Sequence, residues 1–369
     1  MSEEKVGIFQ AAIRQFLGPI VPFLEDKTVS EILINGPDKI FIEKQGKLSL
    51  TTAKFQSEDA LRAAVNTVAQ SVGRRITDDE PRLDARLPDG SRIAVVIPPC
   101  ARNGTTVSIR KFTQNKISLK DYVKMGSLSM DGAQFLDICM HLGKNILVSG
   151  GTGSGKTTLL SLLCSRIPKG QRVIVIEDSS ELSIDYDHIV NFETRQADQL
   201  GKGEVSMKDL LKSSLRLRPD RIIVGEVRSA EAIELINAMN TGHKGCLGTV
   251  HANSPEDSIV RLEALAQGGD AKISEKALRF QVASAIDLII QVSRYQDGSR
   301  RIGAISEVMG LNPDGSYQMQ TLFAMSRMVR QADGKLSGEL QPTGVIPSFM
   351  QEIIDNNLPF SATKFSKAA

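Results

Sequence analysis

The chain has little of what metal centres and disulfide frameworks require. Its 369 residues include four histidines and four cysteines, with no CxxC pair among them. Together these residues match no zinc-ligand pattern, so neither a zinc site nor a set of disulfide bonds is expected. The thiols are predicted to stay reduced, as in a cytoplasm. They belong to Cys100, Cys139, Cys164 and Cys246.

Features of a nucleic-acid groove and of a membrane span are also lacking. The chain has no tryptophan, four tyrosines and a net charge of +2, from 45 basic and 43 acidic residues. A groove for single strands combines aromatic side chains with positive charge, so no specific nucleic-acid partner is expected. No apolar run reaches the ~18 residues of a transmembrane helix. Polar residues and prolines interrupt residues 1–25, which suggest an amphipathic helix, not a signal peptide.

The length predicts two domains, because domains usually contain about 100–150 residues. In the first part, turn residues separate short apolar runs, and Ser57 precedes a helical stripe that ends near Gly73. A polar stretch then predicts a linker. The expected parts are an N-terminal helical segment (1–27), an α+β domain (28–113), the linker (114–130) and a larger α/β domain (131–369).

In the larger domain, apolar runs alternate with helical segments. Strands are predicted at 145–149, 172–177, 221–226 and 246–250, with helices at 156–166, 206–217 and 230–239. Because a crossover helix brings each strand back in the same direction, this sheet is expected to be parallel, as in doubly wound nucleotide-binding folds. Asp-Gly turns then separate 288–292, 302–308 and 317–323, which predicts antiparallel strands appended to the core.

A glycine-rich segment follows the first predicted strand of this domain. It satisfies the pattern GxxxxGK[ST] between a strand and a helix. In this pattern backbone N–H groups converge on a phosphate, the lysine bridges two phosphates and the threonine hydroxyl takes a place on Mg²⁺. Lys156 is therefore a candidate catalytic residue and Thr157 a candidate Mg²⁺ ligand. The expected nucleotide-binding residues are Gly151, Thr152, Gly153, Ser154, Gly155, Lys156, Thr157 and Thr158.

Acidic residues end two of the later strands. Glu177 and Asp178 follow one apolar run, and Glu226 follows another. Since strand ends in such sheets open onto the ligand crevice, these carboxylates are expected to face the γ-phosphate and the metal. Glu226 is predicted to orient the attacking water and to hold Mg²⁺ through a water molecule, with Glu177 helping to polarise that water. The alternative is that Glu177 and Asp178 only cap the following turn.

Several segments together resemble one family, the type II/type IV secretion ATPase superfamily. Residues 215–228 resemble its Walker B block, residues 176–178 its aspartate box, and residues 241–243 with 248–253 its histidine box. Residues 84–93, 108–112 and 201–205 are similar to the CpaF-like branch, which serves tight-adherence (Flp) pili.

This resemblance implies a RecA-like P-loop ATPase core. It implies that ATP hydrolysis powers assembly of a tight-adherence or type IV pilus, and its retraction in some cases, or else secretion. A homo-hexamer in the cytoplasm, peripheral at the inner membrane, would move platform proteins of that membrane and act on pilin indirectly. His251 is interpreted as a γ-phosphate sensor, with general base catalysis as the alternative. His243 is interpreted as either a helix cap or a nucleotide sensor.

Arginines are the remaining candidates, because phosphoryl transfer benefits from positive charge that arrives as the site closes. The family suggests that the smaller domain folds over the nucleotide, and the candidate in the larger domain is open to donation from a neighbouring subunit. For each one, a solvated surface arginine is the alternative. The candidates are Arg86, Arg92, Arg110 and Arg195. A further cluster, read as helix-end charge and subunit contact, consists of Arg216, Arg218 and Arg221.

Two other functions are weighed against the pilus motor. A traffic ATPase of a conjugation-type type IV secretion system would share all core motifs. A nucleic-acid motor would share the core fold but not this composition. The chain has no tetracysteine zinc module after the histidine box, unlike extension ATPases of classical type IV pili and type II secretion. That departure favours the tight-adherence, conjugation-like or retraction branches.

Overall fold

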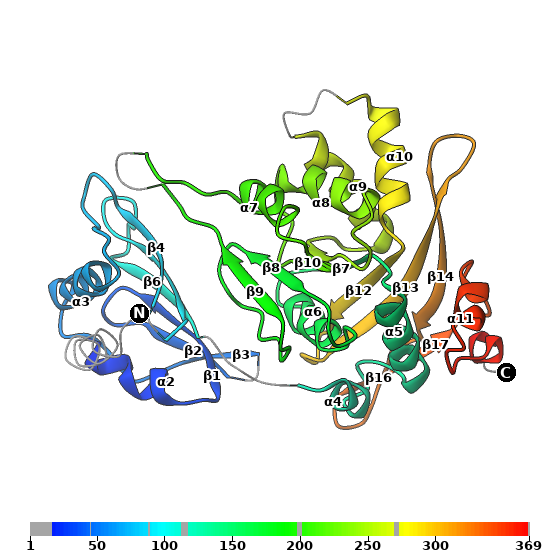
Figure 1. Ribbon diagram of the computed structural model, residues 1–369. Helices are drawn as coiled ribbons and strands as arrows, with labels where there is room; N and C mark the ends of the chain where they lie inside the picture. The colour runs from blue at the N-terminus through cyan, green and yellow to red at the C-terminus, as the bar shows by residue number, and fades with distance from the viewer. Residues whose placement is uncertain are drawn as a thin grey trace. The chain divides into compact units, whose positions relative to one another are not determined.

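The computed structural model describes residues 17–44, 46–87, 89–111, 117–197, 201–268 and 273–367. The chain forms two compact units, Met1–Asn115 and Lys116–Ala369. Figure 1 labels their helices and strands. Within the described ranges, no helix has both the length and the apolar character needed to cross a bilayer.

The first unit is an antiparallel sheet with a helix on one face. Its six strands follow the order β3-β2-β1-β6-β5-β4. The elements are η1 (Gly18–Ile20), α2 (Val21–Glu25), β1 (Val29–Asn35), β2 (Ile40–Lys44), β3 (Lys47–Leu50), α3 (Glu58–Ser71), β4 (Arg82–Arg86), β5 (Arg92–Val96) and β6 (Thr106–Arg110). Of the helical segment expected at 1–27, residues 1–16 lie outside the described residues, and the rest contains η1 and α2.

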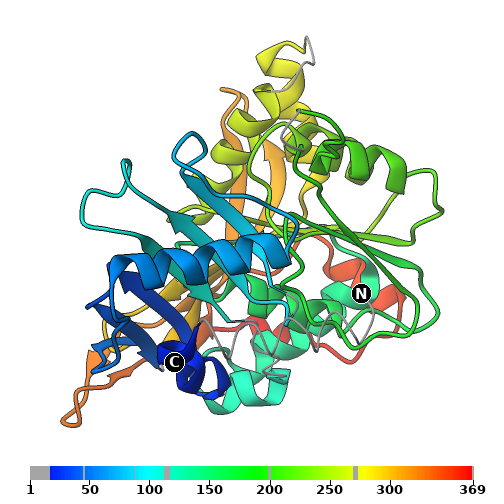
Figure 2. The same cartoon turned by 90° about the vertical axis from the view of Figure 1, so that its left-hand side faces the viewer.

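Helix α3 forms where its cap and its apolar stripe predict. The Ala60 N–H donates to Ser57 Oγ at the start of the helix. Leu61, Val65 and Val68 are buried in one core with the inward side chains of β1, β5 and β6. Figure 2 shows α3, in mid blue, lying across the strands of this sheet. The smaller domain is therefore α+β, built on a single core.

The second unit is a nine-stranded mixed sheet covered by helices. The strand order is β17-β14-β13-β12-β7-β11-β10-β8-β9. Strands β12, β7, β11, β10, β8 and β9 are parallel neighbours, whereas β13, β14 and β17 are antiparallel. These strands are β7 (Ile146–Gly150), β8 (Val173–Glu177), β9 (Ile189–Glu193), β10 (Arg221–Val224), β11 (Leu247–Val250), β12 (Leu288–Arg294), β13 (Arg300–Leu311), β14 (Tyr317–Met325) and β17 (Leu340–Pro342). Both the parallel core and the appended antiparallel strands are as predicted.

Strands β7, β8, β10 and β11 are buried on both faces, which explains their largely apolar sequence. In β7, Ile146 and Val148 pack into one core and Leu147 into the other. One face carries α4 (Leu119–Lys124), α5 (Met130–Leu142) and α6 (Lys156–Cys164). The opposite face carries α7 (Met207–Ser214), α8 (Glu231–Asn240), α9 (Pro255–Gln267) and α10 (Glu275–Ala285). Figure 1 shows α8, α9 and α10 grouped on that face.

The expectation of a linker over residues 114–130 is wrong for most of that range. The unit boundary falls at Asn115, and α4 already belongs to the second unit. Ser118 and Asp121 form a reciprocal capping box at its start, and Tyr122 and Leu128 are buried in the core beneath. The polar residues at the start of this range suggested a linker, but the capping box begins a helix that two apolar side chains hold against the core.

The C-terminal part of the chain closes over the core. Beyond β14 come the short strands β15 (Val329–Arg330) and β16 (Leu336–Ser337), then β17, α11 (Met350–Asp355) and η2 (Ala362–Phe365). Phe365 is fully buried, with its ring centroid 5.4 Å from that of Phe135 and 5.5 Å from that of Phe323. No periodicity in the sequence predicted this packing.

Candidate nucleotide-binding site

The site lies at the carboxyl edge of the parallel strands. Strand β7 runs into the glycine-rich segment, β8 ends at Glu177, β10 is followed by Glu226 and β11 by His251. Because these strands are parallel neighbours, their ends meet at one edge of the sheet, where ligands bind in such folds. The topology thus brings together residues that are up to a hundred positions apart in the chain.

The phosphate loop between β7 and α6 depends on its glycines. Gly153 and Gly155 have positive φ angles of 68° and 99°, a conformation that favours glycine. At Gly150 a Cβ atom would lie 2.4 Å from the Val292 carbonyl oxygen and 2.5 Å from Ser154 Oγ. Helix α6 begins directly after the loop at Lys156, so its N–H groups face the site. Loop and helix end therefore form the anion cradle that the motif predicts.

Lys156 connects the loop to the ends of the neighbouring strands. Its buried ammonium donates to the carbonyl oxygens of Gly150 and Gly151, at 3.0 and 3.1 Å. It also lies 3.3 Å from His251 Nε2, which is 3.0 Å from Glu226 Oε1. Burial, followed by the charge of Lys156, lowers the pKa of His251, although Glu226 acts in the opposite direction. His251 is therefore neutral near pH 7, and its Nε2 atom lies between the Lys156 ammonium and the Glu226 carboxylate.

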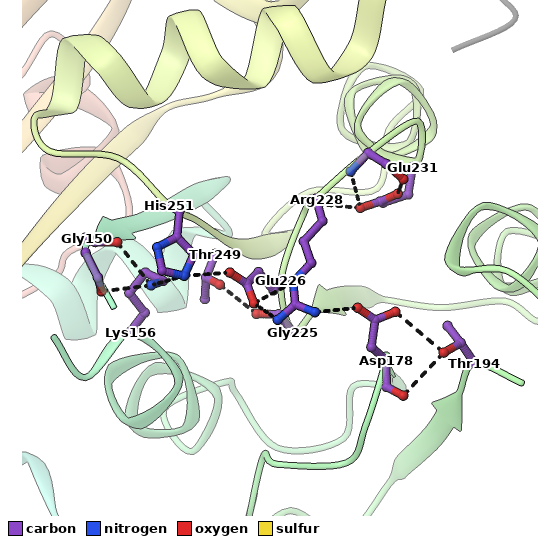
Figure 3. A network of polar contacts seen from close by, with 12 residues as sticks. Gly150, Lys156, Asp178, Thr194, Gly225, Glu226, Arg228, Glu231, Thr249 and His251 are labelled. Carbon is purple, nitrogen blue, oxygen red and sulfur yellow. Dashed lines mark hydrogen bonds and ion pairs between the residues drawn. The ribbon is translucent and has the colours of Figure 1, made fainter. Parts of the chain in front are cut away.

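Glu226 is held on its other side by Arg228, for which the sequence predicted no role of its own. Arg228 donates from Nε to Glu226 Oε2 at 2.8 Å and from Nη2 to the same oxygen. Its Nη1 atom lies 3.2 Å from Asp178 Oδ2, and Asp178 accepts from the Thr194 hydroxyl. Figure 3 shows this line of contacts running from Lys156 to Thr194.

Glu177 is buried and serves the loop that follows β8. Its Oε1 atom accepts hydrogen bonds from the Glu181 and Leu182 N–H groups, at 2.8 and 2.9 Å. Burial raises the pKa of Glu177 to about 7, although these two donors lower it. A Cβ on Gly225 would lie 2.9 Å from the Glu177 Cγ atom, so the Glu177 side chain packs directly against Gly225, the residue before Glu226. This is the turn-stabilising arrangement left open above, and water polarisation by Glu177 stays a prediction.

The oxygen donors at this edge suit Mg²⁺. A threonine hydroxyl from Thr157, in the first turn of α6, and the Glu226 carboxylate are the hard ligands that this ion prefers. Ser154 Oγ is a buried hydroxyl with no hydrogen-bond partner among the residues described. Such an atom in a phosphate loop fits a loop built to hold a ligand.

Comparison with known proteins identifies the family. The sequence model of the type II/IV secretion system protein family matches residues 14–326. The chain belongs to this family.

Individual members and solved structures agree. A putative conjugal transfer protein of Mycobacterium tuberculosis is 34% identical over 317 residues, covering 84% of this chain and 89% of that protein. The type IV secretion system protein VirB11 of Bartonella quintana is 33% identical over 334 residues, covering 80% of this chain and 92% of that protein. The pilus retraction motor PilT with bound ADP has a TM-score of 0.56 at 21% identity, covering 92% and 85% of the two chains, and supports the RecA-like fold alone.

Two other residues lie against the phosphate loop of this secretion-family protein. Arg300, at the start of β13, donates from Nε to the Gly153 carbonyl oxygen at 2.8 Å. Tyr122 of α4 is buried, and a Cβ on Gly155 would lie 3.5 Å from its hydroxyl oxygen. The sequence did not indicate either residue. The predicted turn at Asp297-Gly298 suggested a hairpin of β12 and β13, but not that this hairpin lies beside the phosphate loop.

The two histidines of the histidine box lie at opposite ends of β11. His251 follows the strand at the carboxyl edge, whereas His243 precedes it. At about 3.3 Å per residue, a four-residue strand separates the two by more than ~13 Å. His243 Nδ1 is buried without a hydrogen-bond partner in the described part of the chain. The geometry therefore disfavours His243 as a nucleotide sensor within one chain.

Arg221 is not the surface contact that the sequence suggested. It is 3% exposed, and it donates to Gln171 Oε1 at 2.7 Å and to the Met140 carbonyl oxygen at 3.0 Å. A Cβ on Gly245 would lie 1.3 Å from its Nη1 atom, so the guanidinium fills space left by a glycine. Arg221 is therefore part of the interior.

The candidate arginines are not gathered within one unit. Arg195 is exposed and follows the edge strand β9, with β8, β10 and β11 between that strand and β7. Arg86, Arg92 and Arg110 belong to the first unit, where strand register places Arg92 opposite both others. These three side chains form a row on the face of the sheet opposite α3. Their contact with nucleotide stays a prediction.

Proposed function

We propose that this protein hydrolyses ATP to drive a machine of the type II/IV secretion family. One observation carries the proposal. Lys156 of the phosphate loop, His251 and Glu226 lie in consecutive contact at the carboxyl edge of a parallel sheet. The Lys156 ammonium, which can bind phosphate oxygens, thus lies close to the Glu226 carboxylate, which can orient a water molecule.

Each residue has a defined task in this proposal. The loop N–H groups and the start of α6 bind the phosphates of ATP. Lys156, now bonded to loop carbonyls, turns towards the β- and γ-phosphate oxygens. Glu226 orients the attacking water, and His251 senses whether the γ-phosphate is present. Mg²⁺, held by Thr157 and through water by Glu226, would neutralise charge on the phosphates.

Hydrolysis would be converted into domain motion. We propose a homo-hexamer, peripheral at the inner membrane on its cytoplasmic side, that moves a platform protein. The row of Arg86, Arg92 and Arg110, with Arg195 from the same or a neighbouring subunit, would add positive charge as the site closes. Loss of the γ-phosphate would release those contacts.

Two machines are candidates for the system that this ATPase drives. The segments at 84–93, 108–112 and 201–205 favour a tight-adherence pilus, with pilin moved indirectly. The relatives from Mycobacterium and Bartonella, which carry conjugal transfer and type IV secretion names, favour a conjugation-type secretion system. Both candidates use the same ATP site.

The catalytic proposal is tested by turnover of purified protein with ATP and Mg²⁺. Lys156→Ala and Glu226→Gln are each expected to lower kcat by about 100-fold or more, the scale seen when one charge-stabilising group is lost. Arg327→Ala, an exposed arginine in the C-terminal part, is the matched control and should match wild type. Wild-type turnover in both site variants would refute the assignment.

The choice of machine is tested in the source cell. A strain that carries Lys156→Ala is expected to lose surface pili if the pilus assignment is right, and to lose DNA or protein transfer if the secretion assignment is right. Addition of single- or double-stranded DNA to the purified ATPase should leave its rate unchanged. Strong stimulation would point instead to a nucleic-acid motor.

A further inference from the structure

We propose that Arg228 is a positioning residue for Glu226, and that Asp178 in turn holds Arg228 in place. This inference rests on the proposed ATPase function and deepens it. Arg228 stands two residues after Glu226, between β10 and α8, and reaches back to the same carboxylate (Figure 3). The arrangement divides the two Glu226 oxygens between different partners.

The division of oxygens defines where Glu226 points. Two guanidinium nitrogens of Arg228 bind Oε2. The other oxygen, Oε1, is 3.0 Å from His251 Nε2 and thereby directed towards Lys156 and the phosphate loop. A carboxylate with one oxygen fixed by two donors has little freedom to rotate, because charge-assisted pairs of this kind are directional. Oε1 is therefore left facing the side on which water must be oriented.

Arg228 is itself anchored from two sides. Its backbone N–H donates to Glu231 Oε1, and the Ser229 N–H donates to the same oxygen. Glu231 is buried in the first turn of α8, so the backbone at Arg228 is tied to that helix. The third guanidinium nitrogen, Nη1, meets Asp178 Oδ2 at 3.2 Å. Helix α8 and the end of β8 thus both determine the orientation of the Glu226 side chain.

The charges in this group favour the same conclusion. Lys156 and Arg228 flank Glu226 on opposite sides, with His251 between Glu226 and Lys156. Without Arg228, Glu226 would be free to turn fully towards Lys156 and compete with phosphate for that cation. Asp178 binds the same guanidinium through Nη1. This second contact keeps the Arg228 side chain extended between the ends of β10 and β8.

Steady-state kinetics test this role. Arg228→Gln and Arg228→Ala are expected to lower kcat by about 10- to 100-fold, as for small misplacements of reacting groups, while the KM for ATP changes less than about threefold. Arg228→Lys, which retains charge but offers a single nitrogen, should recover part of kcat. Asp178→Asn should lower kcat less than Arg228→Ala does. Arg327→Ala is the control.

A double variant separates positioning from general damage. If Arg228 acts through Glu226, then Glu226→Gln with Arg228→Ala should be no slower than Glu226→Gln alone. Multiplied losses in the double variant, or a kcat of Arg228→Ala equal to wild type, would overturn the inference. Thermal midpoints of all variants identify any that fail to fold, for which Arg228→Lys remains the test. Absence of turnover in the wild type would instead overturn the proposed function.

Discussion

At the residue scale, Glu177 and Glu226 both follow apolar runs in the sequence but have different surroundings in the structure. The Glu226 side chain is 19% exposed, is bonded to Arg228 and lies 3.0 Å from His251 Nε2. Glu177 is 4% exposed and bonded to the backbone of its own loop. Glu226 is therefore accessible to a ligand, whereas the pKa of the buried Glu177 changes when the chain folds.

The raised pKa of Glu177 predicts how stability depends on pH. The folded chain holds this proton up to a pKa of about 7, whereas the ordinary value is 4.5. Its stabilising contribution is complete below the ordinary pKa and is lost as pH rises through the folded one. At about 1.4 kcal/mol per pKa unit, the loss is on the order of 3 kcal/mol.

Glu177→Gln keeps an oxygen acceptor but cannot ionise. We expect it to raise the thermal midpoint relative to wild type at pH 8 and to change it little at pH 5. Thermal unfolding followed by circular dichroism at the two pH values measures this difference. An equal effect at both values would show that Glu177 ionisation does not matter for stability.

At the element scale, the hairpin formed by β12 and β13 supports the phosphate loop. Strand β12 is the parallel neighbour of β7, and β13 returns beside it. This return places Arg300 against the Gly153 carbonyl oxygen. The antiparallel strands appended to the core are thus part of the site's framework.

Removal of that support should weaken nucleotide binding. Arg300→Ala is expected to raise the KM for ATP about tenfold, the scale of one charge-assisted hydrogen bond, with a smaller change in kcat. Titration with a fluorescent ATP analogue gives an independent measure of affinity. An unchanged KM together with a reduced kcat would instead place Arg300 in the chemical step.

For the whole molecule, the C-terminal part is integral to the second unit. Strand β17 extends the sheet at β14, and Lys364 bonds to Asp131 at 2.9 Å. Phe360 and Phe365 fill the core beside α5. This part of the chain had no assigned role in the sequence, yet it covers the apolar face of the sheet.

Phe365→Ala should therefore destabilise the second unit by about 3–5 kcal/mol, the usual cost of truncating a buried phenylalanine. Phe280→Ala is the matched control, because that side chain is 66% exposed. Chemical denaturation of both variants compares the two sites. An equally small loss of unfolding free energy in both variants would mean that Phe365 contributes little to the stability of the core.

The sequence by itself determined the parts of this protein whose chemistry is local. The glycine pattern at 150–157 defines a phosphate loop because positive φ angles and close backbone approaches need glycine wherever the fold places them. The alternation of apolar runs and helices defined a parallel sheet, and parallel strands put Glu177, Glu226 and His251 at one edge. The polar stretch up to residue 120 misled, because the cap at Ser118 and the buried side chains of Tyr122 and Leu128 place a helix of the second unit there.

Only the tertiary structure decided which of these residues meet. The contact of Arg228 with Asp178, the support of Gly153 by Arg300 and the bonds of Arg221 to Gln171 and Met140 join segments from separate elements. These contacts depend on how far apart the residues lie across the sheet, and the pattern of apolar residues in the sequence does not give that distance. For the same reason the two histidines of one motif, eight positions apart, stand at opposite ends of β11, and only His251 reaches the candidate site.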